Sequence, residues 1–151
     1  MLCRTSRRSM TKAGTTITMD KNGSMEIEGI ATVFLFSKDL QKSVDFYSTI
    51  FGVKPSAGWA DMMSSFQIGD TVFKIHTDKN ATWLPAGAKR GVGMALHFKV
   101  KSADEQWERL NKLNFPLSEK PETLHTGIRK FAMKDPDGYE VEFVELPANP
   151  H

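Results

Sequence analysis

The pattern of hydrophobic and polar positions occurs twice along the chain. Residues 31–52, ATVFLFSKDLQKSVDFYSTIFG, form a strand-like stretch, a polar break and an amphipathic helix, and residues 94–114, MALHFKVKSADEQWERLNKLN, do the same. Thr32 and Ala95 hold equivalent places, 63 residues apart. Further strand-like segments follow each copy. Because a repeat of half the chain decides the architecture, we predict two copies of one βαβββ unit.

The first copy begins with residues 30–36, which are mostly β-branched or aromatic and are apolar on both faces, so they predict a strand buried on both sides. Capping side chains follow, and then apolar residues at helical spacing up to a glycine, which predicts a helix over 39–51. After a loop that contains Trp59, segments 64–68 and 71–76 flank a Gly-Asp pair. We expect a β-hairpin there.

The second copy has clearer boundaries. Residues 95–100 alternate between apolar and polar side chains, which predicts a strand with one covered and one open face. A serine and a glutamate three residues apart form a capping box, and an apolar stripe follows, so we expect a helix over 102–113. The turn sequence DPDG at 135–138 joins two strands that we predict over 128–134 and 139–144.

Length and composition indicate one folded domain. A chain of 151 residues is long enough to bury a core, and 40% hydrophobic with 25% charged residues is typical of a globular protein in solution. No apolar run approaches the roughly 18 residues of a membrane span, so we expect no membrane partner. A single cysteine, Cys3, excludes an internal disulfide, and we therefore predict a cytoplasmic protein.

The formal charge of +2 is distributed unevenly. Residues 1–24 carry five basic side chains against Asp20, a net of +4, which leaves −2 for residues 25–151. The folded part has no excess of positive charge, so we expect no nucleic-acid partner. We predict that residues 1–24 are a flexible basic extension, or the product of an upstream start codon, before a single domain over 25–151. An organelle-targeting segment is the alternative, because the extension is rich in Arg, Ser and Thr.

Two phrases of the sequence carry a family resemblance. SKDLQKSVDFYSTIFG, at 37–52, resembles the first-helix phrase of the glyoxalase/bleomycin-resistance/dioxygenase group, the vicinal oxygen chelate superfamily, and FAMKDPDGYEVEF, at 131–143, is similar to its closing hairpin. The resemblance runs over 30–146. It implies an α+β fold in which two βαβββ units, over about 28–78 and 92–146, form a curved sheet cup with the helices outside. The family includes isomerases, dioxygenases, transferases and non-catalytic drug-binding proteins, so the resemblance leaves the activity open.

The resemblance also implies where a metal would bind, on the first and last strands of each unit. The corresponding positions here are Thr32, Lys74, Ala95 and Glu142. Only the glutamate is a competent ligand, and a lysine brings positive charge to the place of a cation. We therefore expect no metal cofactor, and we predict that a Lys74–Glu142 ion pair replaces the carboxylate–metal bond.

Side-chain parity along the strands predicts which residues line the cup. We expect Lys74, His97 and Glu142 to converge in it, with aromatic side chains at its mouth. The predicted ligand-binding residues are Phe34, Phe36, Trp59, Met63, Lys74, His76, Trp83, His97 and Glu142. The tryptophans and Met63 have an alternative role, packing against a partner subunit, and both roles are compatible.

Three hypotheses of function remain. The first is a metal-free protein that binds a small, partly aromatic organic molecule. The second is a divalent-metal lyase, isomerase or dioxygenase with the shifted ligand set His76, His97 and Glu142. The third is a metal-free acid–base enzyme in which His97 and Glu142 transfer protons. The sequence favours the first hypothesis, because three of the four expected ligand positions lack a competent metal ligand.

The assembly that we predict is a homodimer. The resemblance implies it, because members of the group commonly pair or exchange units between two subunits. Residues 78–93 are long enough to serve as a connecting arm, and they include Trp83 and Leu84. Large apolar side chains of this kind are costly to leave in water on a monomer.

Overall fold

The computed structural model describes residues 10–12, 15–17, 28–59, 61–79, 81, 84–85, 87–117 and 119–148. The chain divides into two compact units, Met1–Ile30 and Ala31–His151. In the first unit, β1 (Met10–Lys12) and β2 (Thr15–Ile17) pair as antiparallel strands, which the sequence pattern did not predict. The second unit contains the repeat. No helix among the described residues has the length and apolar character needed to cross a membrane.

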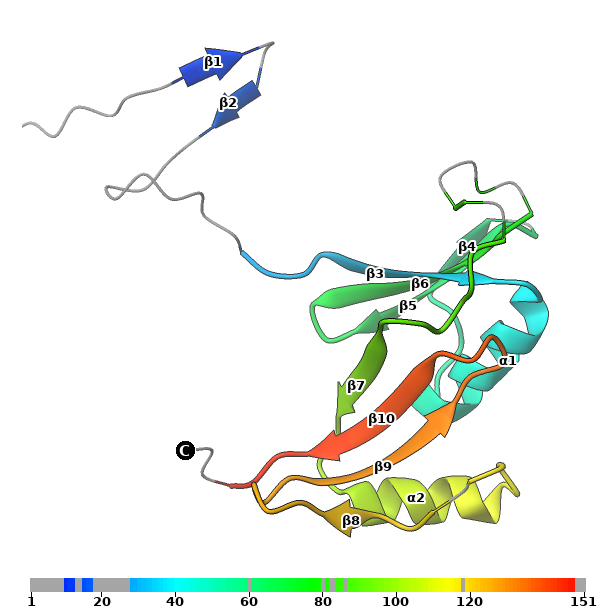
Figure 1. Ribbon diagram of the computed structural model, residues 1–151, viewed down its shortest axis with the longest axis vertical. Coiled ribbons are helices and arrows are strands. Elements are labelled where there is room, and N and C mark those ends of the chain that lie inside the picture. The colour runs from blue at the N-terminus through cyan, green and yellow to red at the C-terminus, as the bar shows by residue number, and fades with distance from the viewer. Residues whose placement is uncertain are drawn as a thin grey trace, which may run out of the picture. The chain divides into compact units, whose positions relative to one another are not determined.

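The first copy of the repeat forms a four-stranded mixed sheet with one helix (Figure 1). Its elements are β3 (Thr32–Ser37), α1 (Leu40–Phe51), β4 (Ala57–Trp59), β5 (Met63–Ile68) and β6 (Thr71–Thr77). The strand order is β3-β6-β5-β4, in which β3 and β6 are parallel and the other pairs antiparallel. The short strand β4 was predicted as a loop, so the placement of Trp59 in a loop was wrong.

The second copy has the same topology (Figure 1). Its elements are β7 (Ala95–Lys99), α2 (Ala103–Lys112), β8 (Glu122–Thr123), β9 (Arg129–Lys134) and β10 (Glu140–Glu145), with strand order β7-β10-β9-β8. Lys74 pairs with the third residue of β3, and Glu142 pairs with the third residue of β7. Lys74 and Glu142 are therefore equivalent, and the predicted α+β fold of two βαβββ units is confirmed.

Both helices begin and end within one residue of the predicted bounds. The Asp39 carboxylate accepts from the backbone N of Lys42 at 3.1 Å and so caps α1, while Gly52 ends the helix in the left-handed region at φ 70°. In α2 the Ser102 hydroxyl accepts from the backbone N of Glu105 at 3.2 Å. Local capping chemistry is therefore sufficient to define these two elements.

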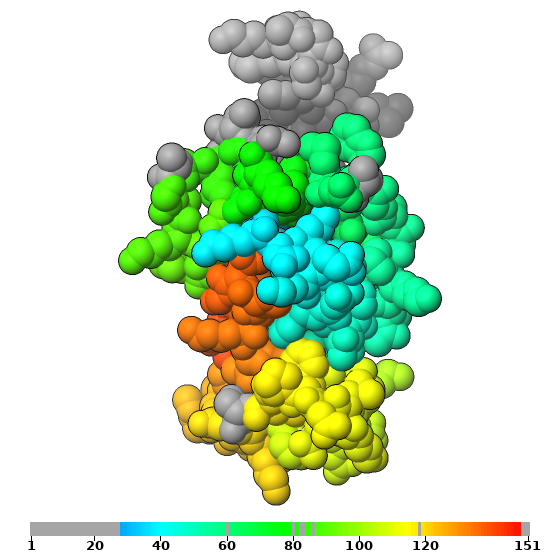
Figure 2. Space-filling view, turned by 90° about the vertical axis from the view of Figure 1, so that its right-hand side faces the viewer, coloured from blue at the N-terminus to red at the C-terminus, as the bar shows by residue number. Residues whose placement is uncertain are grey.

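The helix-covered faces of the two sheets share one core. Phe73 of β6 and Phe98 of β7 lie 5.8 Å apart, and both contact Phe51 of α1, at 5.6 and 4.9 Å between ring centroids. Arg109 of α2 donates to the carbonyl oxygen of Ile50 at 2.7 Å, so α2 is bonded directly to the end of α1. In Figure 2 the cyan and teal atoms of the first copy lie against the yellow and orange atoms of the second. Among the described residues, α1 and α2 are the helices, and the other face of each sheet is not covered by either of them.

The first strand of the repeat differs from its prediction. It was expected to be buried on both sides, but only alternate residues of β3 are buried, with Leu35 exposing 2% of its surface to solvent. Phe34 and Phe36 lie on the helix-free face and are half-buried. An open face made of aromatic residues has the same hydrophobic pattern as a covered one, which is why the periodicity could not separate them.

A buried polar contact joins the two copies. The Tyr47 hydroxyl of α1 donates to the Asp135 carboxylate at 2.8 Å, and both side chains are buried. The other oxygen of Asp135 accepts from the backbone N of Asp137 and of Tyr139, each at 2.9 Å. Burial raises the pKa of Asp135, although these three hydrogen bonds oppose the shift. The helical spacing of apolar residues over 39–51 does not reveal this polar role of Tyr47.

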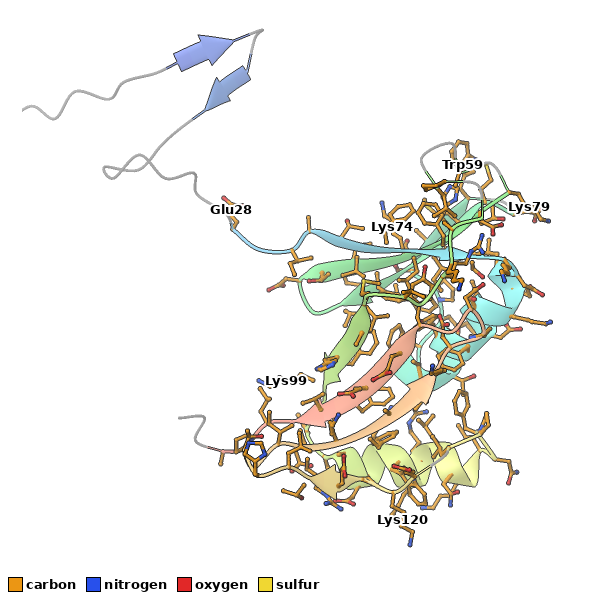
Figure 3. The ribbon with its side chains drawn as sticks, in the orientation of Figure 1. Glu28, Trp59, Lys74, Lys79, Lys99 and Lys120 are labelled. Atoms are coloured by element: carbon orange, nitrogen blue, oxygen red, sulfur yellow. The ribbon has the colours of Figure 1, made fainter. Side chains whose placement is uncertain are left out.

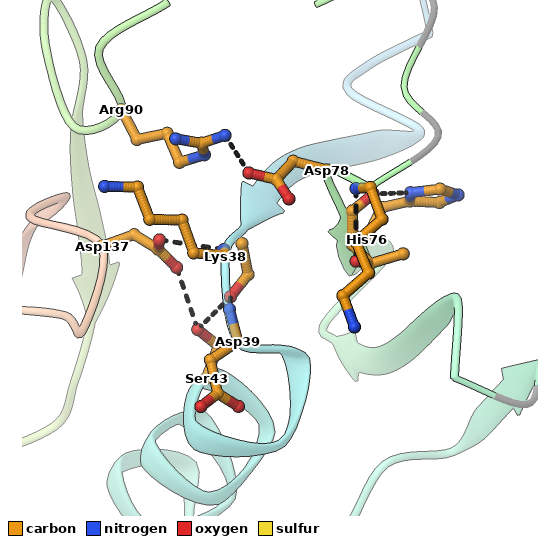
Figure 4. A network of polar contacts seen from close by, with 10 residues as sticks. Lys38, Asp39, Ser43, His76, Asp78, Arg90 and Asp137 are labelled. Atoms are coloured by element: carbon orange, nitrogen blue, oxygen red, sulfur yellow. Dashed lines mark hydrogen bonds and ion pairs between the residues drawn. The ribbon is translucent and has the colours of Figure 1, made fainter. Parts of the chain in front are cut away.

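Asp137 extends this contact to the first turn of α1. Its carboxylate accepts from the backbone N of Lys38 at 3.0 Å and from the Ser43 hydroxyl at 3.2 Å (Figure 4). The turn that joins β9 to β10 is therefore anchored to the start of α1. This explains how a turn of four polar and small residues fixes the second copy against the first.

Asp135 is expected to make stability rise as the pH falls. Its pKa is higher in the folded protein than in the unfolded chain, so the folded state binds more protons in the carboxyl range. We compare the free energy of unfolding of the wild type with that of Asp135→Asn. The wild-type value minus the variant value should increase as the pH falls from 7 through the folded pKa of Asp135. The increase should reach its full size below the ordinary pKa of an aspartate. Urea denaturation at several pH values measures this difference. A difference that stays flat or shrinks on acidification would contradict the assignment.

The connection between the copies is held to the first sheet. The backbone N of Asp78 donates to the carbonyl oxygen of Ser37 at 3.0 Å, and the Asp78 carboxylate pairs with the Arg90 guanidinium (Figure 4). Both of these charged side chains are largely buried, at 17% and 14% exposure, so the pair is shielded from solvent. The end of the connection is thereby fixed before the chain enters β7.

Candidate functional site

Six of the predicted site residues lie on the helix-free face of the first sheet. Strand register pairs Phe34 with Lys74, Phe36 with His76, His76 with Met63, and Met63 with Trp59, and paired residues share a face. Figure 3 shows Lys74 and Trp59 on the same side of this sheet. Parity predicted a shared face for Phe34, Phe36, Lys74 and His76, and the strand register agrees, whereas Trp59 and Met63 were expected in an irregular connection and lie in strands. We call this surface the aromatic face. Trp83 lies outside the described residues.

An aromatic cluster forms the centre of the aromatic face. The Phe34 ring lies 5.6 Å from Phe36 and 5.7 Å from His76, and Phe36 meets the His76 ring edge-on at 6.0 Å. His76 Nδ1 lies 2.6 Å from the carbonyl oxygen of Thr77, which only accepts, so Nδ1 carries a proton. In the neutral ring Nε2 is then the acceptor. The cluster therefore combines aromatic surface with one polar ring nitrogen.

Glu142 is the central residue of the helix-free face of the second sheet. It exposes only 4% of its surface and lies between its strand neighbours His97 and Ala132. The Lys130 ammonium donates to Glu142 Oε1 at 2.7 Å, while His97 Nε2 lies 3.3 Å from Oε2. Oε2 is buried without a hydrogen-bond partner. We call this surface the charged face.

The ionic state of Lys130 follows from its surroundings. Its hydrogen bond to Glu142 raises the pKa of the ammonium, and the nearby Glu122 and Glu140 act in the same direction, against a smaller opposing effect of burial. Lys130 is therefore charged at neutral pH and balances the buried carboxylate. A buried carboxylate without such a partner would be expensive to desolvate.

The predicted Lys74–Glu142 ion pair is wrong within one chain, because Lys130 is the cation that binds Glu142. Lys74 and Glu142 are equivalent in the repeat, but they lie on different sheets. Lys130 is two residues from Ala132, the residue paired with Glu142, and such diagonal neighbours on antiparallel strands are within reach of long side chains. Counting residues back along both strands from the turn at 135–138 would have identified Lys130 as a neighbour of Glu142. His97 and Glu142 do come together as predicted.

The donor set does not fit a divalent metal. Among the described residues, no three His, Cys, Asp or Glu side chains gather in a way that could hold one. His76 lies on the first sheet and Glu142 on the second, so the shifted set is not assembled in one chain. At Glu142 the Lys130 ammonium already occupies one oxygen at 2.7 Å, and its charge repels a second cation.

Two hollows on the surface lie elsewhere. One of about 410 Å³ lies along α2, and one of about 420 Å³ lies beside the first turn of α1. Neither is lined by any of the predicted site residues. The indole of Trp59 on the aromatic face is 66% exposed and the side chain of His97 on the charged face is 57% exposed, so a ligand at either residue would need a further covering layer to be enclosed.

Comparison with known proteins identifies the family. A family model described as Glyoxalase/Bleomycin resistance protein/Dioxygenase superfamily matches residues 29–143. A glyoxalase-related enzyme from Fulvimarina pelagi is 24% identical with a TM-score of 0.68, and the match covers 80% of this chain and 90% of that one. Lactoylglutathione lyase from Agrobacterium tumefaciens is 20% identical with a TM-score of 0.63, covering 80% and 95%. A glyoxalase/bleomycin resistance protein/dioxygenase from Nocardioides is 20% identical with a TM-score of 0.67, covering 84% and 89%.

At these identities the structural likeness shows the fold alone. No curated protein sequence matches the chain. The family model spans most of the chain and includes both phrases that carried the resemblance. The chain therefore belongs to the glyoxalase/bleomycin resistance protein/dioxygenase superfamily.

Proposed function

We propose that this protein binds a small, partly aromatic organic molecule without a metal, between two copies of the chain. The observation that carries the proposal is the aromatic cluster of Phe34, Phe36 and His76 on a sheet face that neither α1 nor α2 covers. Trp59 adds an indole that is 66% exposed at the edge of the same sheet. Flat aromatic rings stack on such side chains with ring centroids about 4.5–7 Å apart.

The chemistry at Glu142 supports binding without a metal. Of the four positions that the resemblance assigns to metal ligands, only Glu142 has a suitable donor, and its carboxylate is paired with Lys130. The positive charge that a metal would supply at this carboxylate is supplied by an ammonium group. We therefore expect the purified protein to bind its ligand in the presence of a chelator.

The directions of the open faces support a homodimer. Figure 3 shows Lys74 and Trp59 projecting from the first sheet away from the side of α1, whereas Lys99 projects from β7 of the second sheet in a different direction. A second copy can place its charged face opposite the aromatic face of the first. It would also cover exposed apolar side chains at the entry to β7, where Val92 is 71% and Met94 40% exposed.

A second candidate function is acid–base catalysis by His97 and Glu142. The observation that favours it is the 3.3 Å separation between His97 Nε2 and the buried Glu142 Oε2. A carboxylate in this place can orient an imidazole for proton transfer, as a general base requires. His97 is 57% exposed in its side chain, so a ligand on the charged face can reach it.

Truncation of the aromatic face is expected to weaken ligand binding. We expect Trp59→Ala to reduce the affinity for the neutral aromatic probe 1-naphthalenemethanol by about tenfold, because the indole provides a stacking surface worth about 1–1.5 kcal/mol. Isothermal titration calorimetry measures the affinity. Val53→Ala, at an exposed apolar residue outside both faces, should leave the affinity within about twofold.

The same samples test the assembly. Sedimentation equilibrium at micromolar concentration should give a mass of about twice 16.9 kDa. A mass of one chain, or equal probe affinity for wild type and Trp59→Ala, would contradict the proposed site between two copies.

A further inference from the structure

Lys130 has hydrogen-bonding capacity that the described residues of the chain do not use. Its ammonium carries three N–H donors, and one of them binds Glu142 Oε1 at 2.7 Å. This is the hydrogen bond that Lys130 makes within the described part of the chain. The side chain is 24% exposed, so the ammonium is held in place but not sealed from the open face. At least one N–H donor is therefore available to a bound molecule.

The position of this ammonium distinguishes it from the other lysines of the charged face. Lys99 and Lys134 are exposed, and their long side chains stay mobile in water. Lys130 is anchored by a carboxylate that is 4% exposed, next to His97. An anchored donor loses less conformational entropy on binding, and a charge-assisted hydrogen bond is stronger than a neutral one.

We propose that Lys130 is a ligand-binding residue that donates a hydrogen bond to an anionic oxygen of the ligand. The inference rests on the proposed binding function and extends it by naming the ligand class, an aromatic carboxylate or a similar aromatic oxyanion. A metal at Glu142 would attract an anionic oxygen of the ligand by its positive charge. The Lys130 ammonium can bind the same oxygen with a charge-assisted hydrogen bond. The aromatic face then binds the ring of the same molecule.

The test uses three probes with one ring system and different charges: 1-naphthoate, 1-naphthalenemethanol and 1-naphthalenemethylammonium. Isothermal titration calorimetry on the full-length protein should show the order naphthoate, alcohol, ammonium, from tightest to weakest. Lys130→Met should weaken naphthoate binding by about tenfold, and leave the alcohol within about twofold, because only the charged oxygen uses the ammonium. Lys134→Met, an exposed lysine on the same strand, should leave all three affinities within about twofold.

Removal of Lys130 leaves a buried carboxylate, so a second variant keeps the test valid if the first fails to fold. Lys130→Met combined with Glu142→Gln removes both charges and should likewise lose the preference for naphthoate over the alcohol. If naphthoate binding is unchanged in these variants while the alcohol still binds, the role of Lys130 is refuted and the binding function stands. Tightest binding of the ammonium probe would refute it too, by placing a cation on Glu142. Failure of all three probes to bind the wild type would refute both proposals.

Discussion

Replacing Gly91 by alanine is expected to lower the free energy of unfolding by about 3 kcal/mol or more. Gly91 has φ +70°, and a Cβ at this position would meet the backbone carbonyl of Gly138 and lie 2.7 Å from the backbone N of Tyr139. These are backbone atoms, which cannot rotate away as a flexible side chain can. Left-handed backbone costs a non-glycine residue about 1–2 kcal/mol, and overpacking adds about 1–3 kcal/mol.

The turn at 135–138, which lies against Gly91, is held in place by hydrogen bonds. Asp135 holds it through two backbone hydrogen bonds, from Asp137 and Tyr139, and is itself bound by the buried Tyr47. Any shift of the turn therefore disturbs the polar contact between the two copies of the repeat. The clash would have to be relieved by displacing the connection at Gly91, which the Asp78–Arg90 pair restrains.

Gly93→Ala is the matched control for the steric part of this effect. Gly93 has φ +79°, but a Cβ at this position would have no other atom within 4 Å, so its substitution carries the backbone cost alone, about 1–2 kcal/mol. Urea denaturation of the two variants measures the difference. If Gly91→Ala and Gly93→Ala lose the same stability within about 0.5 kcal/mol, the predicted steric clash between residue 91 and the turn at 135–138 is refuted.

Helices were predictable in this chain because their signals are local. Ser102 caps α2 through its own side chain, and Gly52 ends α1 in a conformation that few other residues adopt. The strands β4 and β8 have only three and two residues, and they exist through pairing with β5 and β9. Such pairing depends on segments distant in sequence, so no local pattern predicts it.

The sequence was sufficient to predict which sheet face several candidate site residues occupy, but it did not predict the ion-pair partner of Glu142. Period-two parity correctly placed Phe34, Lys74 and His76 on one face, since this follows from strand geometry alone. The partner of Glu142 depends instead on which strands are neighbours and on the reach of each side chain. The internal repeat suggested Lys74, whereas the antiparallel pairing of β9 with β10 makes Lys130 the neighbour. The internal repeat identifies equivalent positions in the two sheets, whereas two side chains form a cross-strand contact only when their strands are neighbours in one sheet.

The ion pair at Glu142 is expected to be the second most sensitive contact of the fold. Lys130→Met should lower the free energy of unfolding by about 2–4 kcal/mol, because it leaves a carboxylate that is 4% exposed with only His97 beside it. Chemical denaturation at neutral pH measures the loss. Lys74→Met, at the equivalent position of the first sheet, serves as the control and should cost less than about 1 kcal/mol, since Lys74 does not pair with Glu142.

A double-mutant cycle separates the ion pair from the packing of the lysine stem. In the background of Glu142→Gln, Lys130→Met no longer leaves a buried charge, so its cost should fall by at least about 1.5 kcal/mol. This coupling energy is the quantity that the contact predicts, because both partners of the 2.7 Å hydrogen bond are changed in turn. An additive cycle, or a Lys74→Met variant that loses as much stability as Lys130→Met, would refute the assignment of Lys130 as the partner of Glu142. In that case the cation at the carboxylate, and with it the proposed contact to an anionic ligand, would have to be sought on the first sheet.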